Sequence, residues 1–320
     1  MGIVPPDPTR DDIALAELPP PGAPPASPRR IAWIRRRRAV ERAWRTYRRS
    51  TMGMIGLGIL IVFVLVAVFA PLLADSKGLD ESLATAQPLL KPSLKYPLGT
   101  DDFGRPVLTL VIWGSRISLM VGLFATIAAM LVGSVVGIAA GYYGGKTDTA
   151  LNMVTNWFLV IPWIALAIAL AAVLGRSLIN IIAVIAITSW AATARLVRSQ
   201  TLTVKERPYV ERARALGAGN WHLVTRHVLP NVFPVIFANT VLTVALAILS
   251  ETTLSLLGLG DPTNTSWGSM IDQAFSAGAI SIGAWWWLFP PGMCIVLVVL
   301  GFTMCGYALD EVLNPRLRRR

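Results

Sequence analysis

The residues with the clearest chemical pattern are Gly141 to Thr147, which read Gly-Tyr-Tyr-Gly-Gly-Lys-Thr. A Gly-Lys-Thr ending is typical of a loop that binds nucleotide phosphates through its backbone N–H groups. That loop needs another glycine five residues before Gly145, where this chain has Ala140, and it needs a preceding strand, whereas an apolar run precedes it here. We therefore expect no nucleotide site on this chain, so any energy from ATP must come from a partner.

No residue pattern predicts a metal site or a catalytic centre. On an α-helix His222 and His227 would lie about 140° apart, so they would not share a face for a metal ion. Cys294 and Cys305 fall in one apolar stretch without His or Asp at ligand spacing, which favours a packing role. We find no catalytic triad and no paired carboxylates, and we expect neither enzymatic activity nor a resident cofactor.

The composition indicates a membrane protein. Of the 320 residues, 54% are hydrophobic and only 15% are charged, which is too apolar for an ordinary soluble domain. The net charge of +11 comes from short basic runs that flank apolar blocks. This arrangement indicates membrane topology and argues against nucleic-acid binding.

Apolar runs of about 20 residues are long enough to cross the hydrocarbon core of a bilayer. Six runs pass this test, and they predict an all-α polytopic fold with six transmembrane helices. Within the second run, Gly133, Gly137 and Gly141 recur every four residues and should let another helix approach closely. The predicted spans are residues 52–74, 117–143, 150–174, 178–199, 232–257 and 285–309.

Outside the spans, the chain has two charged ends. Residues 1–50 begin with a proline-rich stretch predicted to be disordered, and continue into an arginine-rich segment that suits an anionic membrane surface, with RNA binding as the alternative. Residues 51–310 form the predicted transmembrane domain, and residues 311–320 a basic C-terminus.

The distribution of Lys and Arg predicts the orientation. One set of connections, which includes both termini and the segment before residue 232, carries 23 of these residues, and the other set carries 6. Cytoplasmic loops are enriched in Lys and Arg, so both termini should be cytoplasmic. Trp285 to Trp287 would then lie at the outer interface, where aromatic side chains are enriched.

Residues 209–231 form a cytoplasmic segment that is too polar to span. On a helical wheel, Tyr209, Ala213 and Leu216 fall on one face with Val210 and Gly217. Gly217 and Gly219 should allow the left-handed conformation that ends a helix, Asn220 should cap a second short helix, and Pro230 should stop it. The pattern predicts a helix, a bend and a helix that dock on a protein, with an interfacial helix on lipid as the alternative.

A few polar residues within the spans are candidates for a pathway or gate. Glu251 is placed near the outer end of span five, either as a gate or as a solvated helix end. The others could line a water-filled path or form hydrogen bonds between helices. They are Asn152 and Asn156 in span three, and Asn239 and Thr243 in span five.

The sequence Tyr-Val-Glu-Arg-Ala-Arg-Ala-Leu-Gly-Ala-Gly from Tyr209, followed by Arg-His-Val-Leu-Pro-Asn up to Asn231, resembles the EAA loop of ABC importer permeases. Pro97–Arg105, Leu254–Gly260 with Ser266–Gly268, and Leu309–Leu317 are similar to the C-type permease of dipeptide, oligopeptide and nickel importers. The resemblance covers about residues 45–318. Two positions depart from the family pattern: Arg212 replaces the usual Ala of the loop, and Pro106 replaces Asp.

This resemblance implies a type I ABC importer permease in a bacterial cytoplasmic membrane. Its implied partners are a homologous B-type permease, two ATPase domains that bind ATP and Mg²⁺, and an extracytoplasmic peptide-binding protein. Peptides are the expected substrate, with nickel, haem or glutathione as alternatives and an ion-driven secondary transporter as the alternative from another class. The residues implied to couple to the ATPase are Tyr209, Glu211, Arg212, Ala213, Ala215, Leu216, Gly217, Leu229 and Pro230.

Overall fold

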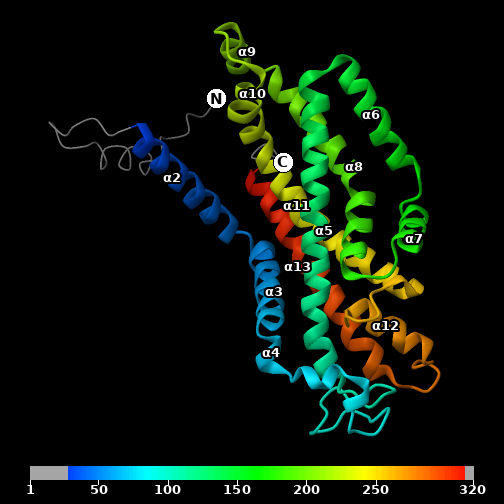
Figure 1. The fold of residues 1–320 in the computed structure, drawn as a ribbon. Helices are drawn as coiled ribbons and strands as arrows, with labels where there is room; N and C mark the ends of the chain where they lie inside the picture. Colours follow the sequence, from blue (N-terminus) through cyan, green and yellow to red (C-terminus); the bar gives the residue numbers. More distant parts are fainter. Residues whose placement is uncertain (1–27, 314–320) are drawn as a thin grey trace, which may run out of the picture. The chain divides into compact units, whose positions relative to one another are not determined.

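The structure is a computed structural model that describes residues 28–313. Helices and connecting loops make up this part of the chain, with one isolated bridge between Thr100 and Pro106 and no β-strand among the described residues. The prediction of an all-α fold is therefore confirmed (Figure 1). The proline-rich stretch at residues 1–27 and the basic residues 314–320 lie outside the described part.

The chain divides into two units, residues 1–45 and residues 46–320, each of which we describe by itself. The described part of the first unit belongs to helix α2, Pro28–Arg48, which holds most of the arginine-rich segment. Within it, Arg37 Nε lies 3.0 Å from Glu41 Oε1 one turn further on, and the Arg37 guanidinium lies over the Trp33 ring. This segment is thus a strongly basic helix.

The second unit holds the membrane helices. Five helices are long and apolar enough to cross a bilayer, and a bent pair would make a sixth crossing. Shorter elements are α4 (Ala70–Leu73), η1 (Ser76–Leu79), η2 (Glu81–Leu83), α9 (Pro208–Ala215), α10 (Asn220–Leu223), α12 (Trp267–Ser276) and the π-turns η3 (Val224–Val228) and η4 (Ser255–Leu259). The long helices are α3 (Thr51–Val68), α5 (Val107–Tyr143), α8 (Leu178–Lys205), α11 (Leu229–Leu254) and α13 (Trp285–Leu313).

The third predicted span, residues 150–174, is not one continuous helix. The structure has α6, Gly145–Val160, and α7, Trp163–Leu174, with a bend of 92° between them. Pro162 explains the break, because proline disfavours the helical conformation of the residue before it, and Ile161 is extended at ψ 127°. Hydropathy alone could not show this, because the residues on both sides are equally apolar.

Two other boundaries also differ from the prediction. α5 begins at Val107, ten residues before the predicted start at residue 117, and α8 continues to Lys205, beyond residue 199. The extra turns contain polar residues such as Ser115 and Arg116, so a hydropathy test stops short of them. Helix α5 is therefore longer than a bilayer requires, and its first turns belong with the polar loop that precedes it.

The close packing predicted for the glycines of span two is confirmed. A Cβ atom on Gly133 would lie 2.6 Å from the Trp190 carbonyl oxygen, and one on Gly137 would lie 2.6 Å from the Ala194 carbonyl oxygen. Real Cβ atoms do not approach a carbonyl that closely, so only glycine fits at these positions. Helices α5 and α8 consequently make the most extensive contact between any two described elements (Figure 1).

One apolar core lies at the end of the bundle where α5 and α13 begin. It joins α5 and α12 to the start of α13 through Val107, Leu110, Trp267, Met270 and Trp287. Trp286 and Trp287 are buried there against other side chains, and Trp285 alone of the three is exposed, so the predicted interfacial position of these tryptophans stays a prediction. Both cysteines lie in α13, where Cys305 is buried and Cys294 half-buried.

Candidate functional site

Helix α9 is held against the membrane helices by part of the apolar face that the wheel predicted. Val210 is fully buried in a cluster with Tyr142, Val197 and Leu223, and Ala213 packs against that cluster. The remaining apolar side chains point away from it. Leu216 is 89% exposed, and Trp221 in α10 is 79% exposed. One side of the segment thus anchors it, and two large apolar side chains remain uncovered.

The bend after α9 depends on Gly217, as predicted. Gly217 has φ +88°, the left-handed region that favours glycine. The Ala218 N–H donates to the Ala213 carbonyl and the Gly217 N–H to the Arg214 carbonyl, which is the Schellman arrangement of a helix end. Gly219 has φ −69°, so the expectation that both glycines adopt the left-handed conformation holds for Gly217 alone.

The second helix differs from the prediction at both ends. Gly219 occupies the N-cap, and Asn220 is the first helical residue, whose Oδ1 accepts a hydrogen bond from the Tyr142 hydroxyl at 3.0 Å. Pro230 does not end this helix, which continues through η3 into α11. Pro230 is in the first turn of α11, directly after the π-turn, where its missing N–H is tolerated best.

The π-turn also corrects the expectation for the two histidines. The rings of His222 and His227 lie 5.8 Å apart, and Tyr209 lies 6.1 Å from His227. A π-turn places residues five apart on the same face, whereas an α-helix would separate them. No group of three or more metal-binding side chains occurs among the described residues, so this cluster is an aromatic contact.

The other residues implied for ATPase coupling lie along the same segment. Glu211, Arg212 and Ala215 are exposed on α9, so the departure from the family pattern at Arg212 falls on the polar face. Leu229 and Pro230 are exposed at the start of α11. Sequence reasoning missed the exposure of Trp221, although a tryptophan directly after a predicted cap was a usable signal.

The polar candidates within the spans make contacts between helices and within them. Asn156 is exposed and its Oδ1 accepts from Arg195 Nη2 at 2.8 Å, so it joins α6 to α8. Asn239 Nδ2 lies 3.8 Å from the Met130 sulfur, and the Thr243 hydroxyl donates to the Asn239 carbonyl. Asn152 is half-buried beside Arg195. These contacts show that the side chains of Asn156 and Asn239 reach a neighbouring helix, and a place on a pathway stays a prediction.

Glu251 is not a solvated helix end. It is 2% exposed, and its Oε1 accepts hydrogen bonds from Ser255 at 2.9 Å and from Ser266 at 2.6 Å. Its Oε2 has no partner among the described residues. Ser266 is the N-cap of α12, so Glu251 joins the end of α11 to the start of α12.

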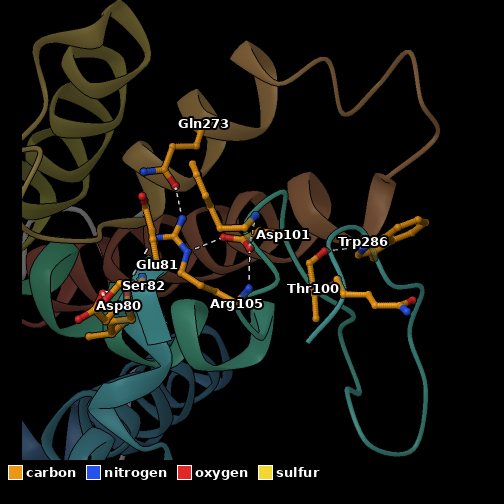
Figure 2. A network of polar contacts seen from close by, with 11 residues as sticks. Asp80, Glu81, Ser82, Thr100, Asp101, Arg105, Gln273 and Trp286 are labelled. Carbon is orange, nitrogen blue, oxygen red and sulfur yellow. Dashed lines mark hydrogen bonds and ion pairs between the residues drawn. The ribbon is translucent and has the colours of Figure 1, made fainter. Parts of the chain in front are cut away.

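The loop before α5 is a compact polar network, shown in Figure 2. Arg105 Nε donates to Asp101 Oδ2 at 2.6 Å, and the Arg105 Nη atoms reach Glu81 at 3.1 Å and Gln273 at 3.2 Å. The Arg105 side chain is only 4% exposed, and a buried ion pair of this kind needs such additional bonds. The network therefore fixes the 80–106 loop against α12.

Other backbone contacts tighten the same loop. Thr100 accepts from the Leu90 N–H through its hydroxyl and from Trp286 Nε1 through its carbonyl. Gly104 has φ +83°, and a Cβ there would lie 2.2 Å from the Ala86 carbonyl oxygen. Pro106 is the N-cap of α5 and bridges to Thr100, so the loop closes without the usual aspartate.

A cavity of about 660 Å³ adjoins this network, and Asp261 is one of the residues that line it. Burial alone would raise the pKa of Asp261, but hydrogen bonds from Thr263, Asn264 and the Leu178 N–H together lower it. In the 80–106 loop, outside the cavity lining, burial raises the pKa of Asp102, and the neighbouring Asp101 carboxylate adds to this. The loop 261–265 is thereby tied to the start of α8.

Family comparisons agree with the helix arrangement. A model of the binding-protein-dependent transport system inner membrane component matches residues 133–319, which include α8, the bend and α11. The chain belongs to this family. A second model, the N-terminal transmembrane domain of oligopeptide transport permease C, matches residues 40–92. The chain is accordingly a multi-pass permease component of a membrane transport complex.

Curated relatives cover most of the chain. The dipeptide transport system permease protein DppC of Alkalihalophilus pseudofirmus is 37% identical over 86% of this chain and 90% of its own length. The oligopeptide permease OppC of Bacillus subtilis is 34% identical, and the match covers 85% of this chain and 88% of OppC. The glutathione permease GsiD of Pectobacterium atrosepticum is 36% identical, and the match covers 71% of this chain and 75% of GsiD.

Among solved structures, a chain of the MetNI methionine ABC transporter in an inward-facing conformation matches the fold of the permease. The TM-score is 0.52 at 20% identity, and the match covers 67% of this chain and 99% of the other. The fold of an ABC importer permease is therefore shown for this chain.

Proposed function

We propose that this permease forms half of the pathway of an ATP-driven importer of peptides in a bacterial cytoplasmic membrane, and that residues 209–231 couple it to the ATPase. A homologous permease would supply the other half. Two ATPase domains would bind ATP and Mg²⁺, and an extracytoplasmic binding protein would deliver the peptide. The dipeptide and oligopeptide permeases among the relatives support peptides as the substrate, and the glutathione permease supports a small peptide-like alternative.

The observation that carries this proposal is the uneven burial of the segment 209–231. Val210 and Leu223 fix it to the membrane helices, whereas Leu216 and Trp221 remain uncovered outside the spans. Large apolar side chains exposed among charged neighbours such as Arg212 and Arg214 are typical of a protein contact. A cleft on the ATPase would cover them.

The proposed orientation follows from charge. The connections on the side of this segment carry 23 Lys and Arg residues against 6 on the other side, which places the segment and both termini in the cytoplasm. The outer cavity and the Arg105 network then face the extracytoplasmic binding protein.

The proposed mechanism is alternating access. Closure of the ATPase domains would move α9 and the bend, and because Val210 anchors α9 to α8 and α11, the movement would pass to the membrane helices. Coupling of this kind requires a contact that differs in free energy between the two states. A docked Leu216 provides such a contact.

The test is co-purification of the ATPase subunits with Leu216→Asp. We expect the aspartate to abolish the contact, because it would bury an unpaired charge in the ATPase cleft. Leu94→Asp is the matched control, since Leu94 is fully exposed in the outer loop. ATPase retained equally by both variants would overturn the proposal.

A second experiment separates the proposal from an ion-driven transporter. The chain would be reconstituted into liposomes without ATPase subunits and tested for uptake under an ion gradient. We expect no uptake, because a secondary transporter would need ionisable groups near the bilayer midplane. Gradient-driven uptake of the peptide by the permease alone would contradict ATP coupling.

A further inference from the structure

A cavity of about 320 Å³ lies where α5 and α8 end and α9 and α10 begin. It is separate from the exposed surface formed by Leu216 and Trp221. The side chains that line it are Tyr142, Tyr143, Lys205, Arg214 and Asn220. None of them is a carboxylate, and two of them are cations.

The groups left free in this cavity are mainly hydrogen-bond donors. Lys205 Nζ donates to the Gly141 carbonyl at 2.9 Å, which leaves two of its three N–H groups. Within residues 28–313, the Arg214 guanidinium forms no hydrogen bond or ion pair, and Asn220 Nδ2 is likewise unused. The Tyr143 hydroxyl also has no hydrogen-bond partner in that range.

A nearby acid does not neutralise these cations. The charge of Lys205 acts on Asp148 in α6, but both Asp148 oxygens bind Arg198, at 2.5 and 2.6 Å. Its charge is thus already engaged in a bidentate pair. The cavity keeps an uncompensated positive charge and suits an anion with several acceptor oxygens.

The position of the cavity indicates the source of the anion. Both α5 and α8 are candidate membrane spans, and they end at Tyr143 and Lys205, so the cavity lies directly beyond the ends of two spans. On α5, Leu131 and Val135 are exposed about one turn apart and share a face, and Tyr143, also exposed, lies about two turns further along toward the cavity. This face offers an apolar track for an acyl chain that leads to the cavity.

We propose that this cavity binds the phosphate headgroup of an anionic phospholipid, with the acyl chain along Leu131 and Val135. Basic pockets between spans at the cytoplasmic surface are suited to such headgroups. Lys205 and Arg214 would contact the phosphate oxygens, and Asn220 and Tyr143 would donate to it. The bound lipid would then bridge the ends of the spans and the α9–α10 segment.

The test uses the full chain purified with its partner permease, before and after addition of the ATPase subunits, and native mass spectrometry to count bound lipid. The probes are dioleoylphosphatidylglycerol, dioleoylphosphatidylethanolamine, and glycerol 1-phosphate, which lacks acyl chains. Each cation near an anionic headgroup contributes a factor of about 5 in affinity. Lys205→Gln with Arg214→Gln should therefore weaken phosphatidylglycerol binding about 25-fold.

Two variants control for charge and folding. Lys91→Gln with Arg116→Gln removes the same charge from exposed residues at the other end of α5 and its preceding loop, and should bind as the parent does. Lys205→Arg with Arg214→Lys keeps both cations and should retain the lipid. An equal loss of phosphatidylglycerol binding in all variants would overturn the proposed site. No loss of binding in Lys205→Gln with Arg214→Gln would also overturn it.

The remaining outcomes decide the ligand. Binding of glycerol 1-phosphate as tightly as the lipid would show a soluble-anion site and overturn the lipid proposal. Displacement of phosphatidylglycerol when the ATPase subunits are added would show that the two cations belong to a partner contact. Retention of the lipid in the assembled complex supports the proposal.

Discussion

Replacement of Gly217 by valine should uncouple transport without unfolding the spans. Gly217 has φ +88°, and no atom lies within 4 Å of the position that a Cβ would take, so the added side chain meets no steric barrier. The cost is conformational: about 1–2 kcal/mol for a side chain in the left-handed region, more for a β-branched one. A loss of 1.4 kcal/mol changes an equilibrium constant by about tenfold, so the ratio of bent to unbent segment should fall about tenfold or more.

The assay compares variants in the reconstituted importer at equal membrane abundance. It measures peptide uptake and the ATP hydrolysis stimulated by the loaded binding protein, and both should fall in Gly217→Val. Gly217→Asn is the matched control, because asparagine tolerates the left-handed conformation, and it should stay near the parent. Gly219→Val, at φ −69° with equally open space, should cost less than about 1 kcal/mol. If valine and asparagine at position 217 behaved alike, the bend would not transmit the coupling.

Two further predictions concern the 80–106 and 261–265 loops. Arg105→Ala should lower the free energy of unfolding by about 3–5 kcal/mol, because it leaves Asp101 buried and unpaired. Glu81→Gln, at a half-exposed side chain, should cost less than about 1 kcal/mol. Thermal unfolding in detergent measures both variants, and equal effects would contradict the role of Arg105. The lowered pKa of Asp261 means that its contribution is fully present above about pH 4 and is lost as the pH falls through the folded-state value. The difference in unfolding temperature between the parent and Asp261→Asn should therefore shrink from pH 6 to pH 3, and a constant difference would show that Asp261 acts without its charge.

The number of apolar spans and the glycine face of α5 could be predicted from the sequence, because each depends on a local property. Length and hydropathy define a span, and four-residue spacing places Gly133, Gly137 and Gly141 on one face. The helix end at Gly217 could be predicted for the same reason, since the left-handed conformation is a property of the residue.

The features that could not be predicted depend on contacts with residues distant in the sequence or on the local backbone conformation. Whether a proline breaks or continues a helix is decided by its neighbours: Pro162 separates α6 from α7 in an apolar run, while Pro230 follows a π-turn within a continuous helix. The burial of Glu251 depends on Ser266, fifteen residues away across a turn. The contacts of Arg105 with Glu81 and Gln273 likewise require the folded loop.

The absence of side chains along one face of α5 limits which movements the permease can make. With Gly133, Gly137 and Gly141 seated against the carbonyls and side chains of α8, neither helix can slide past the other without collision. We therefore expect the two helices to move as a pair in a transport cycle, and α9 to move with them because only residues 206–207 separate it from α8. Bending would then be expected outside this pair, at the break at Pro162 and at the π-turns at either end of α11.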